Sequence, residues 1–234
     1  MEAKIVDDLI QAIMEESYVE DEQLPSENEL AQQYQVPRII ARNAYLKLED
    51  MGYIYSKQGK GRFLKKKRKQ VELVLTGKTS FTEKMKNLGY PFETKNMFCE
   101  RILFHSEIYE RLQVNKDAAV YKIGRVRILN GEPIALHMSY IADSQFPTIE
   151  KDGPEITSIF DYYRACGFFE FGSTKSVLSV SFPTAAEREI LQCNALVPLL
   201  ILETDCYDQQ TGKVLEYTKV MYRSDSFTYE ITQI

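Results

Sequence analysis

The order of elements expected between residues 24 and 64 constrains the fold more than any other feature of the sequence. Ser26 is a favoured N-cap and Glu29 follows three residues later, which is the pattern of a capping box at the start of a short helix. A second helix is expected to place Pro37 at its first position, where the missing N–H has no intrahelical partner. The apolar residues of this helix recur at helical spacing, at Ile40, Ala44, Leu48 and Met51.

A β-hairpin is expected directly after the second helix. Residues 53–55 and 62–64 are aromatic or β-branched runs on either side of a glycine-containing turn. Gly59 and Gly61 permit backbone conformations that would let the tip approach a minor groove with Lys60 projecting, although an ordinary hairpin turn is the simpler alternative. Helix, turn, helix and hairpin together predict a winged helix-turn-helix domain, which is a DNA-binding fold.

Three pieces of this stretch carry a resemblance to a known family. LPSENELA, then Arg38 and Arg42 four residues apart, then GYIYSKQGKGRF resemble the N-terminal domain of the GntR family of bacterial transcription regulators. The resemblance implies binding to double-stranded operator DNA by a homodimer. The residues that it implies for DNA binding are Ser26, Glu27, Arg38, Arg42, Gly59, Lys60 and Gly61.

The two arginines of the second helix have two interpretations. Arg38 and Arg42 lie one turn apart on one face, and an arginine there can donate to both O6 and N7 of a guanine. The alternative is a pair of surface arginines bound to Glu27 or Glu49. The sequence also departs from the family, which usually has serine before the first arginine and threonines after it. Here Pro37, Ile39 and Ile40 stand instead, so hydroxyl contacts to phosphates or bases are lost.

Charge is distributed unevenly along the chain. The formal net charge is −5, yet residues 1–30 hold one lysine and ten acidic residues. Residues 31–70 hold eleven basic and two acidic residues, and this block coincides with the second helix, the hairpin and a basic run. Such a block is typical of a phosphate-binding surface, and a solvated face followed by a charged linker is the alternative.

The same charge pattern divides the chain into two domains. We expect a DNA-binding domain over residues 1–64, which begins with an amphipathic helix over residues 2–17. A basic linker is expected over residues 65–71 and a second domain over residues 72–234. In this second domain, predicted strands joined as hairpins, with helices between them, indicate an α+β fold on a mainly antiparallel sheet.

A second resemblance covers most of the second domain. LTGKTSFTEKMKNLG, YKIGRVRILNGEPIAL, TSIF and LEYTKVMYRSD are similar to the UTRA effector-binding domain of HutC-type GntR regulators, whose fold resembles that of chorismate lyase. The resemblance implies a small-molecule effector. In relatives that sense sugar phosphates, the positions that hold the phosphate match Ser80, Phe81, Thr82, Arg125, Arg127 and Ser158, and the polar end of the ligand is expected to meet His137, Tyr140, Glu216 and Tyr222. The implied effector-binding residues are Ser80, Phe81, Thr82, Arg125, Arg127, His137, Tyr140, Ser158, Glu216 and Tyr222.

An arginine pair on one predicted strand is compatible with the anionic effector that the resemblance implies. Arg125 and Arg127 are two apart on a predicted strand, so both lie on one face, where guanidinium groups can bind phosphate oxygens in pairs. A solvated sheet face is the alternative interpretation of this pair. His137 stands where the family often has glutamate, and it could equally be a half-buried imidazole with its hydrogen bonds satisfied.

Few residues suggest catalysis or metal binding. The four cysteines are scattered without a C-x-x-C pair and there are two histidines, so reduced thiols and no metal or cofactor are expected. No nucleotide loop or nucleophile elbow is present, which argues against an enzyme. We therefore expect a cytoplasmic, ligand-responsive DNA-binding repressor, without a membrane segment. The alternative is a small-molecule-binding or enzyme-like α+β protein with a decayed DNA reader.

Overall fold

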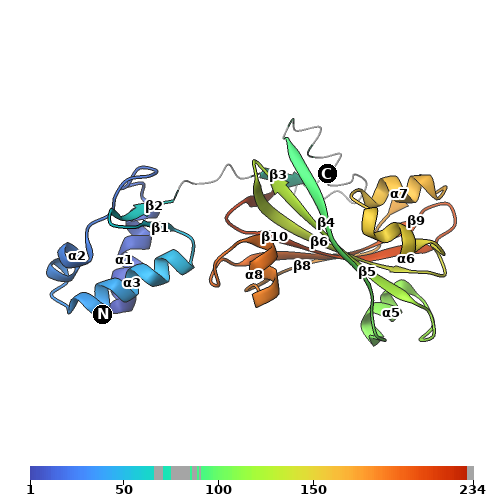
Figure 1. Ribbon diagram of the computed structural model, residues 1–234, viewed down its shortest axis with the longest axis horizontal. Coiled ribbons are helices and arrows are strands. Elements are labelled where there is room, and N and C mark those ends of the chain that lie inside the picture. Colours follow the sequence, from blue (N-terminus) through green and yellow to red (C-terminus); the bar gives the residue numbers. More distant parts are fainter. Residues whose placement is uncertain (66–70, 75–84, 86–88, 90, 231–234) are drawn as a thin grey trace.

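The structure is a computed structural model that describes residues 1–65, 71–74, 85, 89 and 91–230. Figure 1 shows a small helical unit at the N-terminus and a larger unit built on a twisted sheet. Within the described residues, no helix is long and apolar enough to cross a membrane.

The N-terminal unit is a three-helix bundle with a hairpin. Its elements are α1 (Glu2–Met14), α2 (Glu27–Gln33), α3 (Arg38–Asp50), β1 (Ile54–Lys57) and β2 (Gly61–Leu64). The two strands pair antiparallel with Tyr55 opposite Phe63. This is the winged helix-turn-helix that the sequence predicts.

The helix boundaries follow from local chemistry. The hydroxyl of Ser26 accepts from the N–H of Glu29, and the Glu29 carboxylate accepts from the N–H of Ser26 at 2.7 Å, which confirms the capping box. Pro37 is the N-cap of α3 with an extended ψ of 142°, so the helix begins one residue later than the sequence suggests. Proline fits this position equally well, because the N-cap residue also donates no intrahelical bond.

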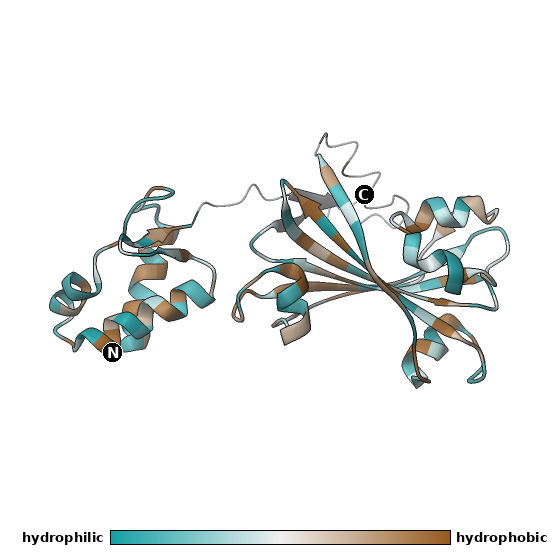
Figure 2. Ribbon diagram, in the orientation of Figure 1, coloured by the Kyte–Doolittle hydropathy of each residue, from teal (hydrophilic) through white to brown (hydrophobic). Residues whose placement is uncertain are grey.

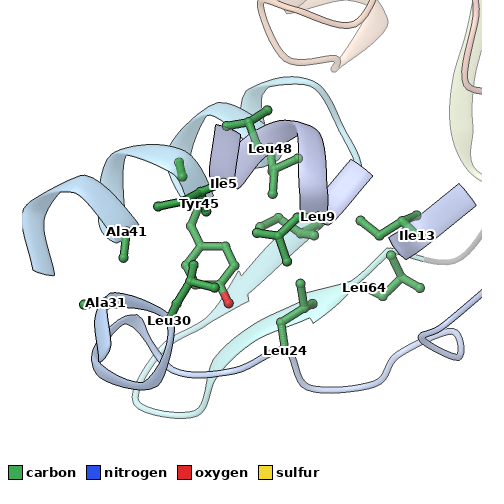
Figure 3. Close-up of a cluster of buried hydrophobic side chains, with 13 residues drawn as sticks. Ile5, Leu9, Ile13, Leu24, Leu30, Ala31, Ala41, Tyr45, Leu48 and Leu64 are labelled. Atoms are coloured by element: carbon green, nitrogen blue, oxygen red, sulfur yellow. The ribbon is translucent and has the colours of Figure 1, made fainter. Parts of the chain in front are cut away.

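One hydrophobic cluster holds the N-terminal unit together. α1 contributes its buried face, α3 contributes Ala41, Ala44, Tyr45 and Leu48, and β2 contributes Leu64 (Figure 3). Tyr45 is 1% exposed, and its hydroxyl donates to the carbonyl of Pro25 at 2.5 Å. Because α3 packs through one face alone, its opposite face is left for solvent or a partner.

The C-terminal unit is built on a seven-stranded antiparallel sheet. Its strand order is β4-β5-β6-β10-β9-β7, and β8 pairs with β9 as a further edge. Hydrophobic residues run along the central strands in Figure 2. The strands are β4 (Phe92–Arg101), β5 (Val120–Leu129), β6 (Glu132–Ala142), β7 (Phe171–Gly172), β8 (Ser176–Ser181), β9 (Leu199–Asp208) and β10 (Val214–Arg223).

Helices cover both faces of this sheet. α6 (Ile149–Asp152), the 3-10 turn η1 (Gly153–Glu155) and α7 (Ile159–Ala165) pack on the face that carries Ile123 and Cys206. α5 (Ser106–Leu112) and α8 (Ala185–Leu191) pack on the opposite face, which carries Tyr217 and Met221. We call the first of these the α7 face.

Two short features complete the fold. β3 (Val71–Val74) pairs in parallel with β11 (Phe227–Glu230), so Val71, which the sequence assigns to the linker, begins a strand. Asn130 and Gly131 connect β5 to β6 with φ of 52° and 80°, the tight hairpin turn that this dipeptide predicts. Residues 66–70 of the basic linker, and Ser80, Phe81 and Thr82 of the implied effector site, lie outside the described residues.

Candidate nucleic-acid and effector sites

The exposed face of α3 carries the arginines that the sequence singles out. Arg38 is the first residue of the helix, and its side chain is 67% exposed. Arg42 is also exposed, and its side chain makes no hydrogen bond or ion pair with the part of the chain that the structure describes. Arg42 is therefore available to an incoming partner.

Glu27 holds two arginines at the start of the helical pair. Its carboxylate accepts from Nε of Arg38 at 2.9 Å and from Nη1 of Arg62 at 2.7 Å. Partial burial opposes ionisation of Glu27, but the hydrogen bonds from Arg62 and Arg38 together outweigh this effect. The pKa of Glu27 therefore lies below the ordinary value. Arg38 is ion-paired and still largely exposed. The structure is therefore compatible both with a contact to DNA and with a surface ion pair.

Arg62 is a structural residue that the sequence reasoning missed. Its side chain is 14% exposed, and its guanidinium carbon lies 5.1 Å from the centre of the Tyr45 ring. Arg62 also lies 4.0 Å from Glu49, so it links the wing to both helices of the motif. The sequence offered one sign of this role: Arg62 lies in the aromatic run of β2, where a charged residue requires a partner.

The wing tip is fixed by a contact from outside the hairpin. Gly59 and Gly61 both have positive φ, 71° and 103°, which a side chain would strain. Gln23 donates from its side chain to the carbonyl of Lys60 at 2.8 Å, while the Lys60 side chain stays exposed. Ser26 is also exposed, but its hydroxyl is used in the helix cap.

A second polar site lies on the α7 face of the sheet, inside the protein. Arg125 on β5 stands opposite His137 on β6, and Arg127 stands opposite Ala135, which in turn faces Tyr222 on β10. Glu216 and Thr218 lie on the same face of β10, because residues alternate along a strand. The residues that gather here, which we call the polar cluster, are Arg125, Arg127, His137, Ser139, Glu216, Thr218 and Tyr222.

Arg125 is the centre of the polar cluster. It is 1% exposed, and its Nη2 donates to the hydroxyl of Ser139 at 2.6 Å. Its Nε and Nη1 have no hydrogen-bond partner among the described residues. Burial lowers the pKa of this guanidinium, and the charge of Glu216 opposes that shift. A buried arginine with two unused donors is costly unless something else binds it.

Arg127 lies beside Arg125 and reaches the start of α7. Its Nη1 donates to the hydroxyl of Thr94 and, at 3.2 Å, to the carbonyl of Thr157. Burial and then the charge of Arg125 lower the pKa of Arg127 to about 9, so the group is still cationic near neutral pH. Ser158, the N-cap of α7, directly follows Thr157 and therefore stands next to this guanidinium.

His137 is neutral in this environment. Burial lowers its pKa well below 6.5, and the charges of Arg127 and Arg125 lower it further. Its ring packs edge-on against Tyr222 with centroids 5.8 Å apart. The cluster therefore combines two guanidinium groups with a neutral imidazole and one carboxylate, that of Glu216, which suits an anion.

The structure brings most of the predicted effector residues together. Arg125, Arg127, His137, Ser158, Glu216 and Tyr222 meet on the α7 face. Tyr140 does not, because it lies on the opposite face, where it stacks on Tyr217 with ring centroids 5.6 Å apart. The placement of Tyr140 with the polar end of a ligand is therefore wrong. Side chains that are an odd number of residues apart on one strand point to opposite faces, and Tyr140 is three residues after His137.

Sequence reasoning missed three residues of this site. Ser139 and Thr218 stand two residues from His137 and Glu216, so strand alternation alone could have found them. Tyr163 of α7 is fully buried, and burial followed by the charge of Glu216 raises its pKa well above the ordinary value.

A separate polar hollow of about 290 Å³ is lined by residues 172–176, Tyr207 and Gln209, none of which belongs to the polar cluster.

A winged helix-turn-helix joined to a sheet with a buried cationic cluster defines a class of protein, namely DNA-binding regulators with a sensory domain. Comparison with known proteins leads to the same class. Residues 2–64 match the family described as bacterial regulatory proteins, gntR family, and residues 88–228 match the UTRA domain. The chain therefore belongs to the GntR family and carries a UTRA domain. It is a DNA-binding transcription regulator rather than an enzyme.

Several relatives are similar over nearly the whole chain. The HTH-type transcriptional repressor NagR of Bacillus subtilis (strain 168) is 30% identical over 89% of this chain and 84% of its own length. The probable fructoselysine utilization operon transcriptional repressor of Escherichia coli O157:H7 is 27% identical over 97% and 90%. PhnF from Mycobacterium smegmatis has the same fold, with a TM-score of 0.63 and 22% identity over 98% and 99% of the two chains.

Proposed function

We propose that this regulator is a repressor whose polar cluster binds a phosphorylated metabolite such as a sugar phosphate, and that this binding changes its affinity for operator DNA. The unused donors of buried Arg125 carry the proposal. The names of two relatives support the repressor role, and the name of one of them, a fructoselysine utilization repressor, supports a sugar-derived compound.

The charge of the site favours a phosphate over a neutral sugar. Arg125 and Arg127 lie side by side with the single carboxylate of Glu216, so an anion offsets the excess positive charge. Guanidinium N–H groups form charge-assisted hydrogen bonds with phosphate oxygens, and Arg125 has Nε and Nη1, on two different edges of its guanidinium, for this purpose. Thr218 adds a hydroxyl without a partner among the described residues.

Calorimetry with sugar phosphates tests this site. A thermal-shift screen first identifies a ligand, since a tight ligand raises the melting temperature by mass action. Arg125→Ala should then weaken binding by about 1.5–3 kcal/mol, the scale of hydrogen bonds to charged groups. Lys122→Ala is the matched control, because Lys122 lies on the same strand but on the opposite face, paired with Glu100.

Two outcomes would contradict the effector proposal. One is equal binding of the phosphorylated and the unphosphorylated sugar. The other is an Arg125→Lys variant that folds normally and keeps full affinity, since lysine retains the charge but not the paired donors of a guanidinium.

The DNA contacts are proposed to rest on Arg38, Arg42 and the wing. α3 would lie in the major groove with its N-terminal residues at base edges, and Lys60 would approach the adjacent minor groove. Arg42→Ala should cost about 1–3 kcal/mol in specific binding, as for an arginine that contacts a base. Unchanged affinity in a quantitative gel-shift titration would show that this docking is wrong.

The protein is proposed to act as a two-fold dimer joined by β8. This strand pairs with β9 alone among the described strands and contains no charged residue. Leu178 and Val180 alternate along it and Phe182 directly follows its last residue; they are 43%, 68% and 59% exposed. Monomeric proteins usually protect such an edge with charges or proline, so a second copy of the strand is the occupant that fits. A dimer also supplies the two readers that an operator with two half-sites requires.

A further inference from the structure

Ile39 is an apolar side chain on the DNA-facing side of α3. It is the second residue of the helix and is 54% exposed, whereas its neighbour Ile40 packs against the core. Ile39 therefore makes no evident contribution to folding. A single exposed isoleucine is unremarkable on most surfaces, but this one lies where a reading helix enters the groove.

The position of Ile39 relative to Arg42 gives it a target. The two residues are three apart, so they lie on the same side of the helix, and both are exposed. If Arg42 contacts a base edge, Ile39 faces the floor of the groove at a neighbouring base pair. An apolar side chain cannot hydrogen-bond there, and the one apolar group that natural bases present in the major groove is the 5-methyl of thymine.

We propose that Ile39 contacts the 5-methyl group of a thymine in each half-site, beside the base pair contacted by Arg42. This inference rests on the proposed docking of α3 in the major groove. It assigns Ile39 as a specificity-determining residue and predicts an A·T pair at a defined position of the operator. The contact buries the methyl against the isoleucine side chain, so it discriminates through apolar area rather than hydrogen bonds.

The test replaces single thymines by deoxyuridine, which removes the methyl and leaves every hydrogen-bonding group unchanged. Full-length protein first selects its site from a pool of random duplexes. Each thymine of the selected site is then replaced in turn, and affinity is measured for the wild type and for Ile39→Ala. At one position per half-site, the wild type should lose about fourfold, the effect of removing one buried methyl, and Ile39→Ala should lose nothing.

Leu46→Ala is the matched control. Leu46 is also apolar, lies on α3 and is 43% exposed, but it stands two turns further from the start of the helix. This variant should retain the wild-type response to deoxyuridine at every position. The inference is overturned if no deoxyuridine effect depends on Ile39, or if the selected half-site contains no thymine. If the protein selects no sequence at all, the proposed docking fails as well, so the two failures are distinguishable.

Discussion

At the scale of single residues, buried charge in the polar cluster makes stability depend on pH. His137 is neutral in the folded protein because burial and two arginines lower its pKa well below 6.5. The unfolded chain binds a proton near pH 6.5, whereas the folded chain does not, so acidification favours unfolding. The contribution of His137 is complete above pH 6.5 and is lost progressively as the pH falls below it.

We therefore expect His137→Gln to remove part of the acid sensitivity. The wild type should lose more free energy of unfolding than the variant between about pH 7.5 and about pH 5.5, a range that spans the unfolded pKa of about 6.5. Chemical denaturation at a series of pH values measures this difference. Replacement of His105, an exposed histidine, by glutamine is the matched control. Parallel curves for wild type and His137→Gln would contradict the assignment.

Glu27 is a second residue whose role is open to direct test. Glu27→Gln removes the carboxylate that binds both Arg38 and Arg62, and the largely buried Arg62 loses its short ion pair. Because the site is near the surface, we expect a cost of about 1 kcal/mol in stability. Operator affinity should also fall, since Arg38 is no longer held. Glu29→Gln, which keeps a side-chain acceptor in the cap, is the control; equal effects of both changes would contradict this role for Glu27.

At the scale of secondary-structure elements, the edge strand β8 carries a prediction about assembly. Val180→Lys places a charge in the apolar row formed with Leu178 and Phe182, and it should shift the protein from dimer to monomer at micromolar concentration. Sedimentation velocity measures this change. Ser179→Lys adds the same charge on the opposite face of the same strand and should leave the dimer intact. A dimer that survives Val180→Lys would place the interface elsewhere.

Sequence reasoning predicted elements best where local chemistry decides them. The capping box at Ser26 and the turn at Asn130 were predictable because each depends on residues a few positions apart. Tyr140 was placed wrongly because strand alternation was not applied to it: it lies three residues from His137 on β6 and therefore on the opposite face. Tyr163 was missed because α7 brings it to the cluster from a distant part of the sequence.

At the scale of the whole molecule, the two units contact each other at the end of α3. Asn194 donates from its side chain to the carbonyl of Glu49 at 2.6 Å, and the N–H of Leu196 donates to the carbonyl of Asp50 at 3.2 Å. The carbonyl of Asp50 is one that the last turn of a helix leaves without an intrahelical partner, whereas the carbonyl of Glu49 also accepts from the N–H of Gly52 at 3.0 Å. The orientation of the reading helix is therefore tied to the loop that follows α8.

This loop is connected to the polar cluster through the sheet. α8 packs on β6, the strand that carries His137. Arg223 of β10 is 1% exposed, and its Nη1 donates to the carbonyl of Leu191 at 3.0 Å and to that of Pro133 at 3.1 Å. The end of α8 is thus fixed to the two strands that form one side of the cluster. A ligand that moves these strands would also move the loop that holds α3.

Asn194→Ala should therefore weaken the coupling between effector and DNA. In the wild type, operator should change effector affinity by a factor of about 5–150, the usual range of allosteric coupling, and effector should change operator affinity by the same factor. In the variant this factor should fall severalfold, while effector affinity without DNA stays close to wild type, because Asn194 lies outside the polar cluster. Calorimetry with and without operator measures both terms, and Asn115→Ala, a change elsewhere in the sheet unit, is the control. A ligand shifts a conformational equilibrium only through contacts that differ between the two states of the protein. A coupling factor unchanged by Asn194→Ala would therefore show that the two units communicate by another route.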